Sequence, residues 1–216
     1  MLLVHGLDHS ARLDWVEPGW PAALAAAGRG ALAVDLPGHG SCPLARPGAI
    51  SVNAIVAALL ATIEATGEEQ IDVVGYSLGA RLVWPLAATG RVRRLVLGGL
   101  NPNDPMAGLD LGLLAALVRG EAEPSQPKLA RLAGLIARAP DPESMLRLVE
   151  ALSTDLFDPA VDVPTVPTLL IAGAEDRPLD QLAARLPAAV HLVVPGDHRG
   201  ALRSPDFRAA VLDFIE

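Results

Sequence analysis

The sequence has little of what defines several large classes of protein. Its 216 residues include one cysteine, Cys42, so an internal disulfide is excluded. No apolar run approaches the roughly 18–20 residues that cross a bilayer, and we expect no membrane-spanning segment. The 25 acidic residues outnumber the 17 basic ones, and a net charge of −8 argues against a nucleic-acid partner, which requires a basic face. Aromatic residues make up only 3%, so aliphatic side chains must build the core.

Signals for targeting, metals and nucleotides are also missing. Met1 leads directly into the apolar residues 2–4, without the basic segment and cleavage site of a signal peptide, and we expect a cytoplasmic protein. One cysteine provides no cysteine-based metal signature, and the glycine-rich turns match neither common nucleotide-binding pattern. We therefore predict no metal and no cofactor.

What is present is an alternation of short apolar runs with longer segments of helical periodicity. Six runs are typical of buried strands in a parallel sheet: 2–4, 31–34, 71–74, 95–97, 168–172 and 190–194. Between the second and third runs, apolar residues recur at helical spacing after Ser51, a candidate N-cap. The alternation predicts a doubly wound α/β fold with a mainly parallel sheet of about six strands.

One long stretch interrupts this alternation. Residues 101–164 contain no strand-like run but three helix-like pieces, separated by proline and glycine. A single crossover needs only about a dozen residues. We therefore predict a core domain of residues 1–100 and 165–216 and a helical cap of residues 101–164 over one end of the sheet. For each leucine of the stripe in residues 107–119, packing against a neighbouring helix is favoured over contact with substrate, although together these leucines suggest an apolar pocket.

A serine stands where the third predicted strand passes into a helix. Gly75-Tyr76-Ser77-Leu78-Gly79 is a G-x-S-x-G pattern. A sharp turn there holds the serine hydroxyl above the carboxyl ends of the strands, and the helix N-terminus favours developing negative charge. Ser77 is therefore a candidate nucleophile. The alternative is that the pattern is only a glycine-rich turn without a catalytic role.

Candidates for a base and an acid follow later strands. His198 follows the last predicted strand, and Asp176 follows the strand before it. Because the carboxyl ends of parallel strands lie at the same end of the sheet, these residues should lie close to Ser77. The order Ser, Asp, His is that of hydrolases with a nucleophile elbow. Glu175, and Asp104 after the fourth strand, are alternatives for the acid.

Three other polar residues near these turns are interpreted as having structural rather than catalytic roles. His5 follows the first strand, and His39 lies in a glycine-rich loop; we interpret both as residues that hold their turns. Arg81 lies one helical turn after Ser77. For Arg81 a packing role is favoured over a contact with substrate.

Five segments together resemble the α/β-hydrolase superfamily. They are His5-Gly6, Asp35-Leu36-Pro37-Gly38-His39-Gly40, Gly75-Tyr76-Ser77-Leu78-Gly79, Gly173-Ala174-Glu175-Asp176 and Gly196-Asp197-His198. They occur in the order of that superfamily and span nearly the whole chain apart from residues 101–164. The resemblance implies that Ser77 is the nucleophile, His198 the base and Asp176 the acid. It also implies an oxyanion hole formed by the backbone N–H groups of Leu7 and Leu78.

The activity implied by the resemblance is that of a serine hydrolase acting on a small molecule. An apolar ester, thioester or lactone would be cleaved through an acyl-enzyme. Two alternatives stay open. Ser77 and Arg81 also resemble a lyase of the menaquinone pathway, which has an arginine four residues after its serine and eliminates pyruvate. A ligand receptor with the hydrolase fold is the non-enzymatic alternative, because such proteins can retain the triad.

The resemblance also predicts an exposed sheet edge. Members of the superfamily usually begin with two strands that have no counterpart here, so the run at 31–34 should lie at the edge of the sheet. Residues 31–34 contain neither the lysine nor the proline that would discourage pairing with another chain. We expect either a homodimer through this edge or a native chain that begins upstream of Met1.

Overall fold

Six parallel strands form the sheet of the computed structural model, which describes residues 1–42, 50–123 and 125–216. The strands are β1 (Leu2–Val4), β2 (Leu32–Val34), β3 (Ile71–Tyr76), β4 (Val92–Gly98), β5 (Thr168–Gly173) and β6 (Ala189–Val194). They lie in the order β2-β1-β3-β4-β5-β6, and every neighbouring pair is parallel. The predicted α/β class and strand number are confirmed. The sheet is entirely, rather than mainly, parallel.

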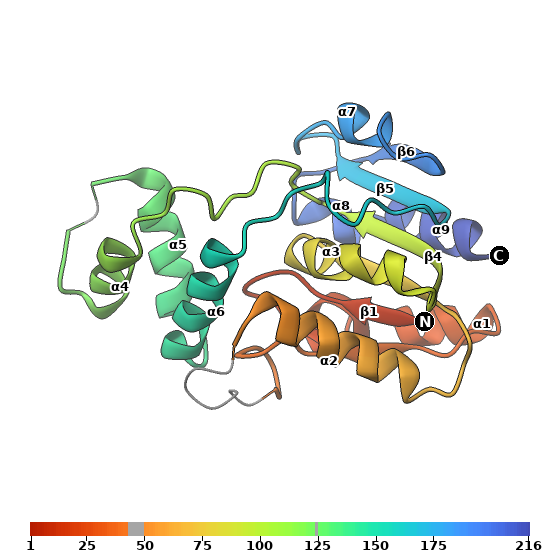
Figure 1. The fold of residues 1–216 in the computed structure, drawn as a ribbon, viewed down its shortest axis with the longest axis horizontal. Helices are drawn as coiled ribbons and strands as arrows, with labels where there is room; N and C mark the ends of the chain where they lie inside the picture. Colours follow the sequence, from red (N-terminus) through yellow and green to blue (C-terminus); the bar gives the residue numbers. More distant parts are fainter. Residues whose placement is uncertain (43–49, 124) are drawn as a thin grey trace.

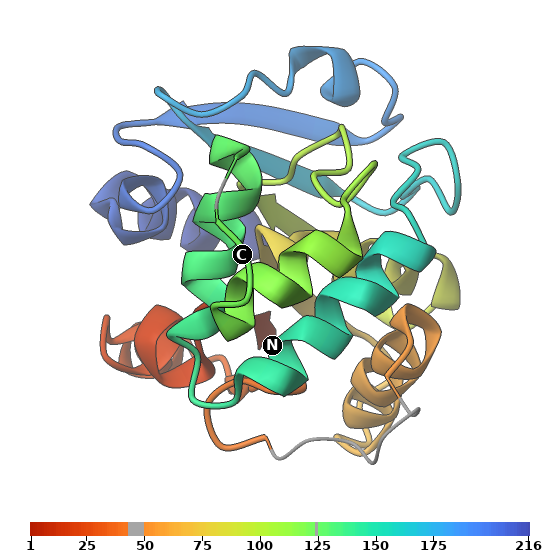
Figure 2. The same ribbon diagram turned by 90° about the vertical axis from the view of Figure 1, so that its left-hand side faces the viewer.

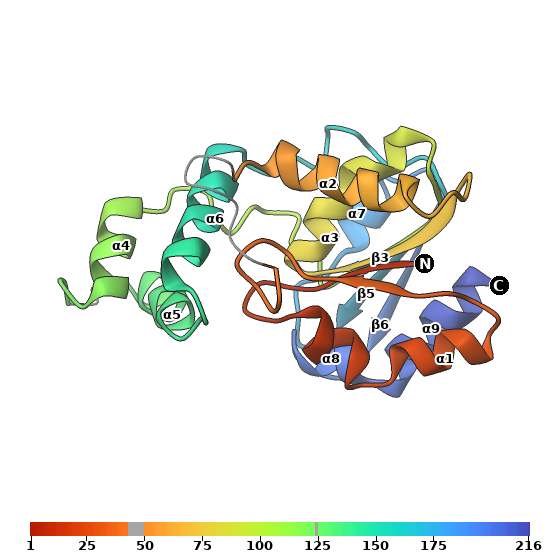
Figure 3. The ribbon, with the colours of Figure 1, turned by 90° about the horizontal axis from the view of Figure 1, so that it is seen from below.

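Helices cover both faces of this sheet. They are α1 (Trp20–Ala26), α2 (Val52–Glu64), α3 (Leu78–Val83), α4 (Leu111–Arg119), α5 (Pro127–Ala137), α6 (Pro142–Thr154), α7 (Asp180–Ala183), α8 (Gly200–Arg203) and α9 (Pro205–Ile215). A π-helical turn spans Arg12–Val16 and a 3-10 helix spans Trp84–Thr89. Figure 3 shows α2, α3 and α7 on one face and α1, α8 and α9 on the other. Among the described residues, no helix is both long and apolar enough to cross a membrane.

Strand periodicity explains why the molecule has two cores. Leu2 and Val4 pack with α2 and α3, whereas Leu3 between them packs with α1 and α9. Successive side chains of a strand point to opposite faces, so a strand covered on both faces is apolar throughout. The start of α2 is set by Ser51, whose Oγ accepts a hydrogen bond from the N–H of Ala54 at 3.1 Å, as its predicted N-cap role requires.

Helices α4, α5 and α6 lie together beyond the carboxyl ends of the strands (Figures 1 and 2). The arrowheads of β4 and β5 point toward this group in Figure 1. Buried residues of the three helices join the core on the α2 and α3 side of the sheet. The three predicted helices of residues 101–164 are therefore present and lie at the end of the sheet that carries the candidate site. Their separation as a cap domain stays a prediction.

The two edges of the sheet are β2 and β6. Within the described part of the chain, β2 pairs only with β1, so 31–34 lies at an edge as predicted. Leu32 is 40% exposed on this strand. Association of two copies through β2 stays a prediction.

Candidate active site

Ser77 lies in the sharp turn between β3 and α3. Its backbone has φ 54° and ψ −112°, a region that residues other than glycine rarely adopt. The N–H of Ser77 donates to the carbonyl of Gly98 at 2.8 Å, and its carbonyl accepts from the N–H of Arg81 at 3.2 Å. Hydrogen bonds on both sides therefore hold this strained conformation and keep Ser77 at the carboxyl end of the sheet.

The two glycines of the pattern are required by close backbone approach. A Cβ on Gly75 would lie 2.5 Å from the carbonyl oxygen of Gly79, and a Cβ on Gly79 would lie 2.2 Å from that of Val4. No larger residue fits at either position without moving backbone. The same crowding places the loop after β1 against Ser77, because a Cβ on Gly6 would lie 3.3 Å from the Ser77 Cβ.

His198 and Asp176 form a hydrogen-bonded chain with Ser77. The Nε2 of His198 lies 2.9 Å from the Ser77 Oγ, and its Nδ1 lies 2.6 Å from the Asp176 Oδ2. With a proton on Nδ1 that is donated to Asp176, Nε2 is free to accept from the serine hydroxyl. The structure thus brings together, from the ends of β3, β5 and β6, the three side chains that the sequence indicated.

The Asp176 carboxylate is stabilised in its charged form. Burial opposes the charge, but hydrogen bonds from His198 and from the N–H of Arg177, at 2.9 Å, outweigh it and lower the pKa of Asp176. Tyr76 holds the other side of the histidine, since its hydroxyl donates to the His198 carbonyl at 2.5 Å. Burial raises the pKa of Tyr76, which keeps that hydroxyl a donor. These contacts fix both the charge of Asp176 and the backbone of His198.

The two alternatives for the acid lie elsewhere. The side chain of Asp104 is 4% exposed and forms an ion pair with Arg81 at 3.1 Å, and it also accepts from the N–H of Met106 at 2.8 Å. Glu175 is exposed. Asp176 is therefore the carboxylate that contacts His198. The burial of Arg81 agrees with its interpretation as a packing residue.

The histidines near the N-terminus have separate partners. His5 is fully buried, with Nδ1 2.7 Å from the carbonyl of Gly6 and Nε2 accepting from the N–H of Leu36 at 3.0 Å. His39 contacts the carbonyl of Pro37 and the N–H of Asp8, so both residues hold turns, as interpreted from the sequence. His5 and His9 do have an H-x-x-x-H spacing, which our sequence analysis missed. A turn separates them, and His9 binds the buried carboxylate of Asp14 instead.

A family model described as "Alpha/beta hydrolase family" matches residues 1–211. The chain belongs to this alpha/beta hydrolase family. The family assignment agrees with the resemblance found in the sequence.

The chain is similar to several differently named proteins. The 2-succinyl-6-hydroxy-2,4-cyclohexadiene-1-carboxylate synthase of Serratia proteamaculans (strain 568) is 28% identical over 221 residues, covering 90% of this chain and 82% of the relative. The enol-lactonase from Burkholderia xenovorans LB400 has a TM-score of 0.76 at 20% identity, with 99% of this chain and 89% of that chain covered. MenH from S. aureus has a TM-score of 0.73 at 19% identity, with coverages of 99% and 91%. The two structures establish likeness of fold.

Ser77 lines a cavity of about 380 Å³ in this alpha/beta hydrolase. Leu7 and Leu78, the predicted oxyanion residues, line it together with all three residues of the hydrogen-bonded chain. Leu78 is the first residue of α3, where backbone N–H groups have no partner within the helix. The loop that carries Leu7 is held by Asp14, which accepts from the N–H of Gly6 at 3.3 Å. Both residues thus lie at the cavity that a substrate would enter.

Of the three helices in residues 101–164, α5 contributes side chains to the lining of this cavity. No residue of the stripe predicted for 107–119 lines it, and Leu114 is fully buried in the core. Leu132 and Leu135 of α5 are among its apolar lining residues, whereas the leucines of residues 107–119 do not line it, as the packing interpretation of each of them predicts. An apolar stripe tells which face of a helix is buried but not which helix faces the site, because that depends on how the three helices pack.

Charged residues of the cavity were also missed by the sequence analysis. Lys128 and Arg131 of α5 line it, as do Arg177 and Arg199. The last two directly follow Asp176 and His198, and this adjacency was a signal that could have identified them.

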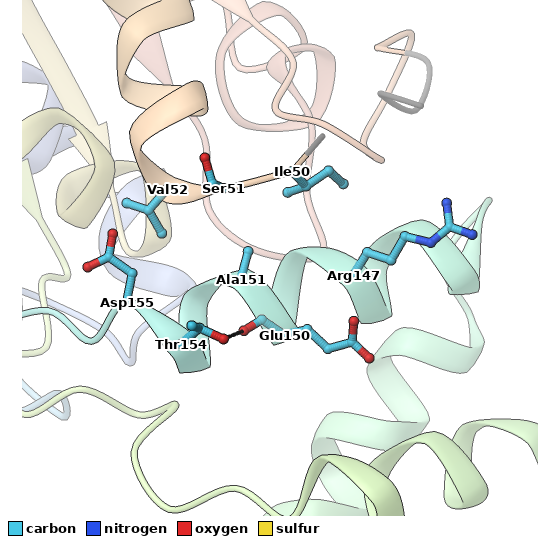
Figure 4. A pocket seen from close by; sticks show the side chains of 8 residues that line it. All are labelled: Ile50, Ser51, Val52, Arg147, Glu150, Ala151, Thr154 and Asp155. Atoms are coloured by element: carbon cyan, nitrogen blue, oxygen red, sulfur yellow. Dashed lines mark hydrogen bonds between the residues drawn. The ribbon is translucent and has the colours of Figure 1, made fainter. Parts of the chain in front are cut away.

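A separate hollow of about 310 Å³ lies between the start of α2 and α6 (Figure 4). Ile50, Ser51 and Val52 face Ala151 and its neighbours across it. Within α6 the hydroxyl of Thr154 donates to the carbonyl of Glu150 at 2.9 Å. No member of the Ser77 chain lines this hollow, so the candidate site remains at the 380 Å³ cavity.

Proposed function

We propose that the protein is a serine hydrolase that cleaves an ester, thioester or lactone of a small molecule. The proposal rests on one observation. Ser77 Oγ, both ring nitrogens of His198 and the Asp176 carboxylate form an unbroken chain of hydrogen bonds at the wall of a cavity of ligand size.

The reaction follows from the position of each proton. His198 Nε2 takes the Ser77 proton while Oγ bonds to the substrate carbonyl carbon, and the carbonyl oxygen becomes an oxyanion. In this mechanism the N–H groups of Leu7 and Leu78 donate to that oxygen, a contribution of about 3–4 kcal/mol for one such donor in other hydrolases. Return of the proton from His198 to the leaving oxygen or sulfur breaks the scissile bond and leaves the acyl-enzyme.

Water completes the cycle by the same route. His198 takes a proton from the water as the water oxygen bonds to the acyl carbon, and Ser77 leaves with that proton. The products are an acid and an alcohol or thiol, so water is the only co-substrate. Asp176 remains ionised throughout and stabilises the imidazolium that forms in each half of the cycle.

Elimination by the same residues is the second candidate. It is favoured by the 28% identity to the Serratia synthase and by Arg81, which lines the cavity one helical turn from Ser77. In that reaction the pair of Ser77 and His198 would remove a proton from carbon, and no acyl-enzyme would form. The Arg81 guanidinium, however, is already bonded to Asp104 and to the carbonyl oxygens of α6 and of Asp155.

Covalent labelling distinguishes these candidates from a ligand receptor. We expect hydrolysis of at least one p-nitrophenyl ester in a series of increasing acyl length, and complete loss of it in Ser77→Ala. A fluorophosphonate should add its mass to the peptide that contains Ser77. Labelling without ester turnover favours the elimination, which is tested by following loss of pyruvate from a pyruvyl-bearing substrate. Neither labelling nor turnover would favour the receptor.

A further inference from the structure

The charge of the catalytic cavity is opposite to the charge of the protein. Five cationic side chains line it, namely Arg81, Lys128, Arg131, Arg177 and Arg199, against one carboxylate, Asp176. The whole chain carries a net charge of −8, and Lys128 is its single lysine. Basic residues are thus concentrated at this site in a chain that is otherwise short of them.

Part of this positive charge is already neutralised. Arg81 is paired with Asp104 at 3.1 Å, Arg199 with Asp8 at 3.2 Å, and Asp176 with His198. Lys128, Arg131 and Arg177 have no carboxylate within 4.0 Å in the described ranges. The remaining residues, 43–49 and 124, contain no aspartate or glutamate. Three positive charges therefore remain uncompensated at the cavity wall.

These charges come from two sides. Lys128 and Arg131 are three residues apart in α5, so they lie on one face of that helix, next to Leu132. Arg177 belongs to the loop after β5 and directly follows the aspartate of the site. A substrate bonded to Ser77 would lie between the helix and that loop, with cations on both sides of it.

From this arrangement we infer that the substrate carries a carboxylate besides its scissile bond, held by Lys128 and Arg131 with Arg177 opposite. The inference rests on the proposed function and narrows its substrate class. Like charges held close together repel, and an anion relieves that repulsion while accepting charge-assisted hydrogen bonds. A volume of about 380 Å³ suits a small acid rather than a large phosphorylated carrier. The inference adds an anionic end to the apolar ester, thioester or lactone expected from the sequence.

Two matched pairs of esters test the inference. One pair is p-nitrophenyl hemiadipate and its methyl ester, with the carboxylate on the acyl side. The other is 4-acetoxybenzoate and its methyl ester, with the carboxylate on the leaving group. In at least one pair we expect kcat/KM to be about tenfold or more higher for the anion, the factor typical of one charge-assisted hydrogen bond. Raising the salt concentration should reduce this preference.

Variants of α5 identify the residues responsible. Lys128→Gln/Arg131→Gln should remove the preference, because kcat/KM for the anionic esters should fall about tenfold further than kcat/KM for the neutral esters. Arg138→Gln is the matched control, because Arg138 is an exposed residue at the end of the same helix that does not line the cavity. The inference is overturned if neutral esters are cleaved by Ser77 with no preference in either pair, or if the preference survives the double substitution.

A binding assay separates this inference from the proposed function. If no ester is cleaved, the subsite is tested by reductive methylation of Lys128 in the presence of adipate or of sodium chloride at equal ionic strength. Adipate should slow methylation of Lys128 roughly threefold or more, while the amino group of Met1, which lies near the carbonyl of Gly30, serves as the internal reference. Equal rates in adipate and chloride would overturn the subsite.

Discussion

Acid should destabilise the fold through His5 before it protonates the carboxylates. His5 is fully buried at the end of β1, and its two ring nitrogens bond to the carbonyl of Gly6 and the N–H of Leu36. These bonds require a neutral ring with its proton on Nδ1. Burial lowers the pKa of His5 from 6.5 to about 4, although the carboxylate of Asp35, 3.8 Å away, opposes the shift.

The sign of the effect follows from which state binds the proton. Between pH 6.5 and 4 the unfolded chain protonates this histidine and the folded chain does not, so stability falls as the pH falls. A difference of that size corresponds to about 3 kcal/mol below pH 4, of which about 2 kcal/mol is lost by pH 5. Above pH 7 the contribution is constant. Asp176, whose pKa is lowered, adds a loss only at still lower pH.

Urea unfolding at a series of pH values measures this loss, with His5→Gln as the comparison. The glutamine oxygen reaches the place of Nε2, where it can accept from Leu36, but it does not titrate. We expect the free energy of unfolding of the wild type to approach that of His5→Gln by about 2 kcal/mol between pH 7.5 and 5. Burial also lowers the pKa of His39, so His39 adds to the pH dependence with the same sign. His39→Gln is the control that measures this separate contribution.

Two results would refute the reasoning about His5. The first is a constant difference between wild type and His5→Gln over this pH range. The second is an NMR titration in which the buried ring changes charge near pH 6.5. Because His5 precedes the loop that carries Leu7, acid should also loosen one side of the proposed oxyanion hole.

Further predictions concern the catalytic chain, the elbow and the sheet edge. Asp176→Asn should lower kcat by roughly three to four orders of magnitude, with Glu175→Gln near wild type; equal effects would remove Asp176 from its role. Gly79→Ala, whose Cβ would lie 2.2 Å from a carbonyl oxygen, should cost about 3 kcal/mol or more in thermal unfolding. Gly112→Ala, with its nearest contact at 3.5 Å, should be neutral or stabilising. Leu32→Lys should convert a dimer formed through β2 to monomer in light scattering; a monomeric wild type would contradict that interface.

The turn at Ser77 and the positions of His198 and Asp176 could be predicted because each depends on the local sequence. Gly75 and Gly79 mark a strand-to-helix turn that only glycine tolerates, and this turn alone defines where Ser77 points. His198 and Asp176 follow apolar runs that a parallel sheet must align. The carboxyl ends of all parallel strands lie at the same end of the sheet, so three residues far apart in sequence could be placed together without knowledge of the contacts.

The charged wall of the cavity could not be predicted in the same way. Lys128 and Arg131 occupy one face of a helix, but nothing local indicates that this face turns toward Ser77 rather than toward water. The answer depends on how α4, α5 and α6 pack against one another and on the sheet. The leucines of α4 satisfied the same periodicity and proved to face elsewhere.

Arg81 connects the core to the segment that carries Lys128 and Arg131 of the cavity wall. Its guanidinium bonds to Asp104, at the beginning of the inserted segment, and to the carbonyl oxygens of Leu152 and Asp155, at the end of α6. One side chain of α3, the helix that directly follows Ser77, thus contacts both ends of the segment that carries α5. A buried pair of this kind costs several kcal/mol to break from one side, because the remaining charge is left without a partner. Arg81, for which the sequence favoured a packing role, therefore ties the inserted segment to α3, and Lys128 and Arg131 of that segment remain the proposed contacts of the substrate carboxylate.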